Sequence, residues 1–133
     1  MNIQKFTQKS LEAIQNAQSI ALENQNSQIE QEHLMLSLLE QEDSLIKELL
    51  KKMGITNGFE ETLKNKINMM PKMSGGARPN DSIYVSRDVD VTLNDAEKIA
   101  TKMKDEYVSV EHIMLSLFDN ANGQIKDLFR TYG

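Results

Sequence analysis

Several features on which many proteins depend are absent or scarce in this sequence. It contains no cysteine, which excludes disulfide scaffolds, thiolate zinc sites, cysteine nucleophiles and iron–sulfur clusters. Aromatic residues make up only 5%, and there are 2 prolines and 6 glycines. No apolar run approaches the roughly 20 residues that span a bilayer, and the first residues lack the apolar core of a secretory signal. We therefore expect a cytoplasmic protein that has no membrane partner.

The charge balance is acidic in a chain of ordinary domain size. The 133 residues include 20 acidic and 15 basic ones, which gives a net charge of −5. This sign disfavours nonspecific contacts with phosphates, so nucleic acid is not expected as a partner. Hydrophobic residues make up 39% and charged ones 26%, a composition that supports a buried core.

An internal repeat is the strongest signal in the sequence. The segment Ile29–Leu39 recurs as Val108–Phe118. The offset of 79 residues holds without a gap between residues 6–54 and residues 85–133. Chance similarity between two helices does not keep one register over several elements, so we interpret the repeat as a duplication.

Hydrophobic periodicity predicts helices in both copies and no sheet beyond a stray pairing. Thr7 and Ser86 are the expected N-caps of the first helix in each copy. The third helix is expected to follow Asp43 in one copy and Asn122 in the other. The first copy adds a fourth helix, which is expected to begin at Asn57. The resulting division is a first repeat at 1–70, a linker at 71–84 and a second repeat at 85–133, together forming one domain.

The second copy stops where its fourth helix is expected to begin, which we interpret as truncation. About seven helices are therefore expected, with an eighth missing. Without that helix, we expect Leu128 and Phe129 to lack cover. The predicted fold is all-α, with two tandem repeats related by pseudo-two-fold symmetry.

No set of residues in the sequence supports catalysis. The glycine pair at 75–76 is not followed by the Lys-Ser/Thr of a phosphate loop, so it is interpreted as linker. His33 and His112 lack the spacing of a metal site and are expected to pack or hydrogen bond at helix starts. Ser37 and Ser116 are expected to donate to the carbonyl four residues earlier. We therefore expect no enzymatic activity, no metal and no cofactor in this chain.

Glu32 and Glu111 occupy equivalent positions in the first turn of the second helix of each copy. One interpretation is that they complement the positive end of the helix dipole. The other is that they flank a recess between the copies and contact a basic or polar group of a partner. The sequence leaves both interpretations open.

A doubled helical unit of this kind resembles the Clp N-terminal domain that heads the ClpA, ClpB and ClpC families of AAA+ unfoldases. The resemblance covers essentially the whole chain, and four segments carry it: 6–7, 32–39, 70–75 and 105–112. The segment 70–75, Met-Pro-Lys-Met-Ser-Gly, is similar to the connection typical of the ClpB type. The Leu-Gly that often ends the first helix in the family is replaced here by Glu23-Asn24 and Met103-Lys104.

The resemblance implies a stress-response chaperone module that engages unfolded or aggregated proteins on a hexameric ring. The ATP and Mg of the parent protein would then belong to AAA+ modules outside this chain, and a DnaK-type system would act through other domains. Three family positions, matched by Leu93, Ile99 and Ile113, imply a partly exposed apolar groove with an acidic rim. The residues implied in substrate binding are Thr7, Leu93, Ile99, Asp105, Glu111 and Ile113, with Glu32 as a secondary candidate.

The alternative implied by the resemblance is a module of the ClpC or ClpA type, which docks adaptors or phosphoarginine for a protease-coupled unfoldase. In that family paired glutamates contact the ligand, and Glu32 and Glu111 match them.

Overall fold

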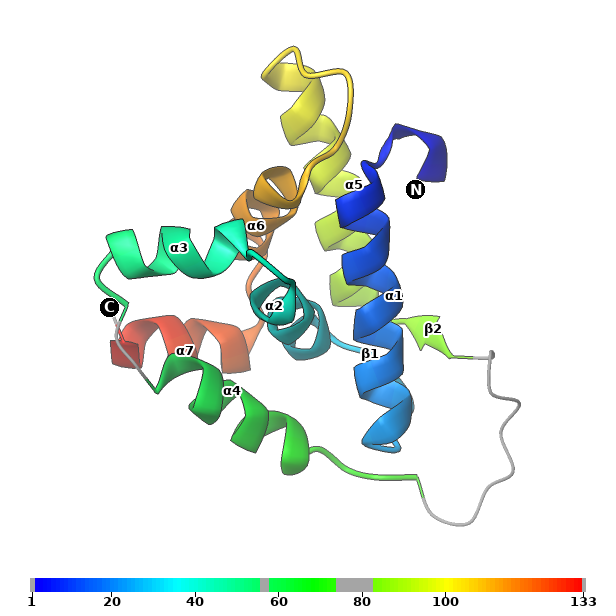
Figure 1. Ribbon diagram of the computed structural model, residues 1–133. Coiled ribbons are helices and arrows are strands. Elements are labelled where there is room, and N and C mark those ends of the chain that lie inside the picture. The colour runs from blue at the N-terminus through cyan, green and yellow to red at the C-terminus, as the bar shows by residue number, and fades with distance from the viewer. Residues whose placement is uncertain (1, 56–57, 74–82, 133) are drawn as a thin grey trace.

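The chain folds almost entirely into helices. The computed structural model describes residues 2–55, 58–73 and 83–132. The expected helix start at Asn57 and the linker glycines at 75–76 lie outside these residues. The elements are η1 (Ile3–Lys5), α1 (Gln8–Glu23), β1 (Gln28–Ile29), α2 (Gln31–Glu40), α3 (Leu45–Lys52), α4 (Phe59–Asn68), β2 (Tyr84–Val85), α5 (Arg87–Lys102), α6 (Val110–Asp119) and α7 (Gly123–Tyr132) (Figure 1). The all-α prediction is confirmed, and none of the described helices is long and apolar enough to cross a membrane.

Polar caps begin the first helix of each copy, as the sequence predicts. The Thr7 hydroxyl accepts a hydrogen bond from the Ser10 amide at 3.1 Å, and the Ser86 hydroxyl accepts one from the Val89 amide at 3.2 Å. Each bond satisfies an amide that has no partner inside its own helix. The third helix of the first copy begins one residue later than expected, because Ser44 rather than Asp43 is its cap.

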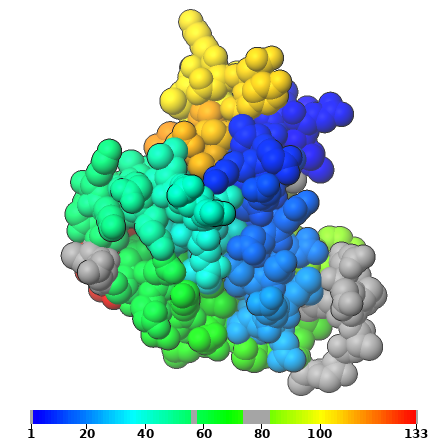
Figure 2. Space-filling model, viewed as in Figure 1, coloured from blue at the N-terminus to red at the C-terminus, as the bar shows by residue number. Residues whose placement is uncertain are grey.

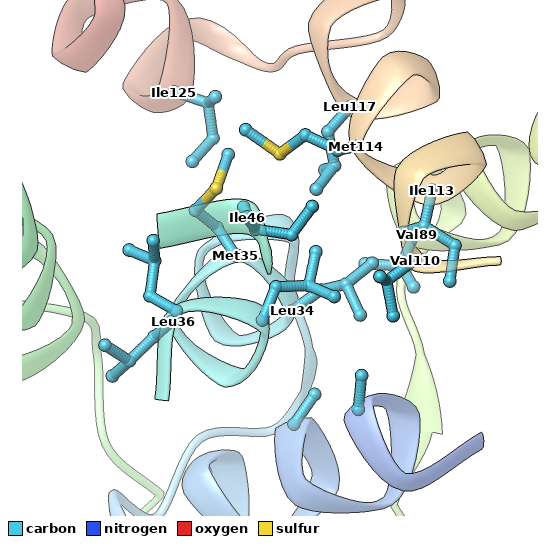
Figure 3. Close-up of a cluster of buried hydrophobic side chains, with 14 of the residues drawn as sticks. Leu34, Met35, Leu36, Ile46, Val89, Val110, Ile113, Met114, Leu117 and Ile125 are labelled. Carbon is cyan, nitrogen blue, oxygen red and sulfur yellow. The ribbon is translucent and has the colours of Figure 1, made fainter. Parts of the chain in front are cut away.

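Helices α2 and α6 form the centre of the core. Every residue of α2 from Gln31 to Leu39 is buried, which explains why this segment is apolar nearly all round. Met35, Met114 and Ile125 point toward one another where α2, α6 and α7 meet (Figure 3). Because thioether side chains are unbranched and flexible, they suit such an irregular junction of three helices.

Two serines on these central helices bond across to a neighbouring helix rather than within their own. The Ser37 hydroxyl donates to the Ala13 carbonyl, and the Ser116 hydroxyl donates to the Thr92 carbonyl, both at 2.6 Å. The expectation that they bond to the carbonyl four residues earlier is therefore wrong. Their small side chains let the paired helices approach closely, so the backbone carbonyl of the neighbouring helix comes within reach.

Each repeat is joined to the other by the same exchange of short extended segments. Strand β1 pairs with β2 in parallel, with Ile29 opposite Val85. An isolated parallel bridge joins Phe6 to Val108. The two pairs are related by the repeat offset, so the start of each copy pairs with the loop between the first two helices of the other. Figure 2 shows the N-terminal residues in dark blue beside the yellow end of α5.

Helix α4 of the first repeat crosses to the second repeat and covers α7. The rings of Phe59 and Phe129 stack with centroids 5.6 Å apart, and the hydroxyls of Thr62 and Tyr132 are 2.6 Å apart. Leu128 is only 1% exposed. The expectation that Leu128 and Phe129 lack cover is therefore wrong, because their cover comes from the other copy.

Candidate functional site

Thr7 lies where the N-terminal segment meets the loop before α6. Its amide donates to the Val108 carbonyl at 3.0 Å, and the Val108 amide donates to the Lys5 carbonyl at 2.7 Å. The Thr7 hydroxyl donates to the Ser10 hydroxyl, which in turn donates to the Val108 carbonyl, both at 2.9 Å. The first turn of α1 is thus tied to the second repeat, and Thr7 remains partly exposed there.

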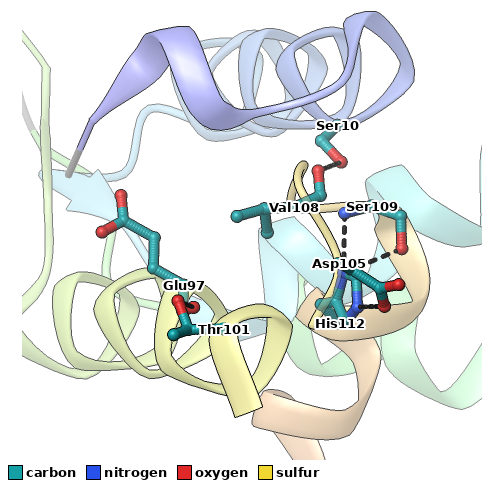
Figure 4. A network of polar contacts seen from close by, with 7 residues as sticks. All are labelled: Ser10, Glu97, Thr101, Asp105, Val108, Ser109 and His112. Carbon is teal, nitrogen blue, oxygen red and sulfur yellow. Dashed lines mark hydrogen bonds and ion pairs between the residues drawn. The ribbon is translucent and has the colours of Figure 1, made fainter. Parts of the chain in front are cut away.

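Asp105 lies on the same loop and is held by a buried histidine (Figure 4). The Nδ1 atom of His112 accepts a hydrogen bond from the Ser109 amide at 2.9 Å. The proton of the neutral ring therefore lies on Nε2, which donates to Oδ2 of Asp105 at 2.8 Å. The Asp105 side chain is 49% exposed and that of His112 is 5% exposed. Oδ2 of Asp105 thus helps to orient the loop. No described residue donates a hydrogen bond to its other carboxylate oxygen, Oδ1.

Ser109, His112 and Asp105 form a chain of contacts, but this chain lacks the function of a catalytic triad. The Ser109 hydroxyl is 3.0 Å from Nδ1 of His112. That nitrogen already accepts the Ser109 amide, so its lone pair is not free to take a proton from the hydroxyl. The arrangement is a capping box at the start of α6. Among the described residues, no group of three or more His, Asp or Glu side chains could hold a metal ion.

The first repeat contains a neutral counterpart of this pair. Nε2 of His33 is 2.8 Å from Oδ1 of Asn26, and its Nδ1 accepts the Glu30 amide at 2.8 Å. Burial lowers the pKa of His33 to about 4, because the charged ring would lose its hydration. Both histidines hydrogen bond at helix starts, as predicted. The two loops differ in charge, since Asp105 stands where the first repeat has Asn26.

Glu32 and Glu111 have different environments in spite of their equivalent positions. Glu32 is 5% exposed and accepts a hydrogen bond from the Asn122 side chain at 3.0 Å. Burial raises the pKa of Glu32 above its usual value. Glu111 is exposed and has no ion pair or side-chain hydrogen bond to any described residue. Glu32 lines a recess of about 280 Å³ between the loop that precedes α2 and Met70 and Pro71, and Glu111 is not among the residues that line it.

Two of the three residues expected in an apolar groove belong to the core. Leu93 is 1% exposed and Ile113 is 0% exposed, so the expectation that they are partly exposed is wrong. Both lie on the faces through which α5 and α6 pack into the centre of the molecule, where Ile113 lies beside Val89 and Val110 (Figure 3). Ile99 alone of the three is partly exposed.

Three other apolar side chains are exposed on the two segments that lead into the bridge between Phe6 and Val108. Ile3 is 57% exposed, Met103 is 56% exposed and Tyr107 is 53% exposed. Met103 falls on the apolar stripe of its helix in the sequence, but α5 ends at Lys102, so the side chain leaves the core. Together with Thr7 and Asp105, these three residues define what we call the loop surface, at the end of the molecule where Figure 2 shows dark blue beside yellow.

Comparison with known proteins identifies the family. The family model of the Clp repeat (R) N-terminal domain matches residues 5–132 of this sequence. The chaperone protein ClpB of Clostridium tetani is 39% identical over 129 residues, which are 96% of this chain and 15% of that protein. The ClpB of Nitratidesulfovibrio vulgaris is 38% identical over 120 residues, which are 90% of this chain and 14% of that protein. The chain thus spans about 15% of the length of these curated relatives.

Solved structures share the fold. The N-terminal domain of Hsp104 from Candida albicans has a TM-score of 0.84 and 28% identity, over 97% of this chain and 82% of that one. A ClpV N-domain in complex with a VipB peptide has a TM-score of 0.75 and 19% identity, over 98% of this chain and 81% of that one. The second similarity concerns the fold alone. The chain therefore belongs to the Clp repeat N-terminal domain family, and its curated relatives over most of its length are ClpB chaperones.

Proposed function

We propose that this chain is the substrate-engaging N-terminal module of a ClpB-type disaggregase, and that it binds unfolded or aggregated polypeptide at the loop surface. The observation that carries the proposal is the exposure of Met103 and Tyr107 on the loop that carries Asp105, and of Ile3 on the N-terminal segment that is bridged to this loop. The similarity to ClpB chaperones supports it. The apolar contacts are assigned to these three residues in place of the buried Leu93 and Ile113, and partly exposed Ile99 remains a candidate.

The physical basis is a small apolar surface with acidic neighbours. Exposed apolar side chains bind unfolded segments without reading their sequence. Asp105 and Glu111 attract basic segments first, because opposite charges steer the encounter. The affinity is expected to be weak, since the captured chain loses conformational freedom that a few contacts only partly offset.

In this proposal the chain itself is non-catalytic. Unfolding work would be done by AAA+ modules of a hexameric parent, which would bind ATP and Mg outside this chain. The Clp repeat domain of this chain would deliver polypeptide to that ring.

The alternative, docking of an adaptor or of phosphoarginine, uses Glu32 and Glu111 together. One observation favours it, because Glu32 lines a recess. However, Glu32 is buried and already accepts a hydrogen bond from Asn122. A ligand would have to displace that bond, so we favour the loop surface.

The test is the binding of a labelled unfolded protein, casein, followed by fluorescence anisotropy. The double variant Met103→Gln/Tyr107→Gln should bind several-fold more weakly than the original chain, because both side chains are exposed and contribute contacts rather than core packing. Leu45→Gln is the matched control, since Leu45 is 52% exposed on α3. Equal losses in the double variant and in the control would refute the assignment to the loop surface.

A further inference from the structure

Asn122 joins the start of α7 to α2 of the other repeat, where the two helices lie side by side (Figure 1). Its backbone amide donates to Oε1 of Gln31 at 2.8 Å, and its side-chain amide donates to Oε1 of Glu32 at 3.0 Å. Its side-chain oxygen accepts a hydrogen bond from the Ile125 amide at 2.9 Å, which makes Asn122 the N-cap of α7. One residue therefore caps a helix of the second repeat and ties it to the first.

The two partners of Asn122 on α2 are buried. Gln31 is 0% exposed and Glu32 is 5% exposed. The side-chain nitrogen of Gln31 also donates to the Thr92 hydroxyl at 3.0 Å and to the Asn120 carbonyl at 2.8 Å. The second repeat thus engages both the nitrogen and the oxygen of this side chain. Polar atoms buried in such a network depend on their protein partners, because water does not replace a partner that is lost.

Asn122 is followed by a glycine that leaves the peptide nitrogen between them accessible. Gly123 is exposed. Apart from its chain neighbours and its own helix, no atom lies within 4 Å of the position that a Cβ would take. Its amide is the first of α7, so it has no partner inside the helix. Because glycine has no side chain, nothing on this residue shields the nitrogen from the side chain of Asn122 or from water.

An asparagine followed by glycine loses its side-chain amide through attack by the next backbone nitrogen. A bond forms between the nitrogen of Gly123 and Cγ of Asn122, and the amide proton of Gly123 passes to solvent. The bond between Cγ and Nδ2 breaks, and the nitrogen leaves as ammonia. Water then opens the cyclic imide at one of its two carbonyls, which gives aspartate or isoaspartate. One water is consumed and one ammonia is released, and no oxidant or reductant takes part.

The fold controls this reaction through the hydrogen bonds of the Asn122 side chain. Glu32 holds its nitrogen, and the Ile125 amide holds its oxygen. Closing the five-membered ring turns Cγ toward the nitrogen of Gly123 and breaks both bonds. The reaction therefore proceeds from a locally open state, in which Asn122 has left α2.

The product does not restore the closed state. Aspartate has an acceptor where Nδ2 was a donor, so two carboxylates face each other across the 3.0 Å contact with Glu32. Burial already raises the pKa of Glu32, and a second negative charge beside it disfavours the ionised pair further. Isoaspartate adds one carbon to the backbone at the start of α7, which displaces the cap.

We propose that Asn122 is a site of spontaneous deamidation, and that its conversion to aspartate or isoaspartate uncouples α7 from α2. The reaction occurs during openings of the contact between the repeats, and it makes them permanent. The extent of deamidation therefore measures how long the module has spent open. This inference goes beyond the proposed function and does not depend on it.

The first test is the rate of deamidation at pH 8, followed by mass spectrometry of the tryptic peptide 105–126, with fragment ions that separate Asn122 from Asn120. The same peptide, incubated alone, is the reference. We expect Asn122 to react several-fold more slowly in the folded chain than in the free peptide. Glu32→Ala removes the acceptor of Nδ2 and should speed the reaction several-fold. Glu32→Gln keeps an acceptor and should react at nearly the original rate.

Leu50→Ala is the control for a general loss of stability, since Leu50 is buried in α3. It should leave the rate at Asn122 unchanged at a temperature where every variant is folded. A rate in Glu32→Ala no faster than in Leu50→Ala would overturn the inference. So would the absence of deamidation at Asn122 from both the original chain and Glu32→Ala.

The second test measures the consequence for the fold by urea denaturation at pH 8. Asn122→Asp reproduces the aspartate product and should lower the urea midpoint of the original chain. Most of this loss should vanish in the Glu32→Gln background, because the side-chain amide of glutamine donates to the new carboxylate. Asn16→Asp adds the same charge at an exposed residue of α1 and should leave the midpoint nearly unchanged. Equal losses from Asn122→Asp in the two backgrounds would show that deamidation does not act through Glu32, and the proposed uncoupling would be wrong.

Discussion

Asp105 accepts a hydrogen bond from the buried ring of His112 at 2.8 Å, so a candidate binding residue is also part of the fold. Its Oδ2 atom holds the histidine, and its other oxygen has no described partner. The two roles of the side chain are thus carried by different atoms, and different substitutions separate them.

Replacing Asp105 by alanine should destabilise the protein, and replacing it by asparagine should not. Alanine leaves the Nε2–H of His112, which is 4% exposed as a residue, without a partner, at a cost of about 1–3 kcal/mol in unfolding free energy. Asparagine supplies an acceptor, as Asn26 does for His33, so its cost should stay below about 1 kcal/mol. Urea denaturation at pH 7 measures both. Equal costs for the two variants would show that the hydrogen bond contributes nothing.

Acid should destabilise the protein through His33. The pKa of this histidine is about 4 in the folded protein against an ordinary 6.5, so the unfolded chain binds the proton more readily. Unfolding free energy should therefore fall as the pH drops from about 6.5 to about 4 and then level off, by at most about 3 kcal/mol from this group. Urea denaturation at a series of pH values measures the slope.

His33→Gln is the variant that isolates this contribution. Glutamine at this position can accept the Glu30 amide as the third residue of a capping box, but it does not titrate. The variant should be less stable than the original chain at pH 7, because Asn26 loses the hydrogen bond from the buried histidine ring. Its stability should depend less on pH between 6.5 and 4. An unchanged slope would assign the acid sensitivity to other groups.

Ionisation of Glu32 should change the unfolding free energy with pH in the opposite direction to that of His33. Its pKa is raised in the folded protein, so the folded state holds the proton more tightly and loses stability as the pH rises from about 4.5 through the folded value. Glu32→Gln removes this loss and keeps an acceptor for Asn122, so the variant should be at least as stable as the original chain at pH 7. Glu111→Gln is the matched control and should lower stability by no more than about 1 kcal/mol, the contribution of an exposed charge in the first turn of a helix. A clear loss of stability in Glu32→Gln would show that the charged form is required by the fold.

The repeat made most of the fold predictable from the sequence. The offset of 79 residues and the caps at Thr7 and Ser86 predict the helices that the structure contains. The crossing of α4 onto α7 was not predictable in the same way. Periodicity shows that the helix that contains Phe59 has an apolar face. It does not show which copy this face packs against, because both copies offer similar surfaces.

The candidate site was less predictable, for a physical reason. Family positions indicate Leu93 and Ile113, and apolar residues at helical spacing are core residues more often than groove residues. Exposure at Met103 depends on where α5 ends, and helix ends are the least certain part of a prediction from periodicity. The segment after α4 lies against the loop at 24–26 through hydrogen bonds from the Met73 amide to the Gln25 carbonyl and from the Asn26 side chain to the Pro71 carbonyl, which no local sequence pattern encodes.

The burial of Leu93 and Ile113 leads to the last prediction. Leu93→Gln and Ile113→Gln each place an amide in the core, where its donors and acceptor find no water, and each removes apolar packing. Both variants should lose several kcal/mol of unfolding free energy, in the range of about 2–5 kcal/mol known for core truncations. Casein binding and urea denaturation are measured on the same samples, at a temperature where the original chain is fully folded. Loss of binding should follow the fraction of unfolded protein. A variant that keeps its stability and still loses casein binding would show that the binding site includes the face of α5 and α6 that carries these two residues.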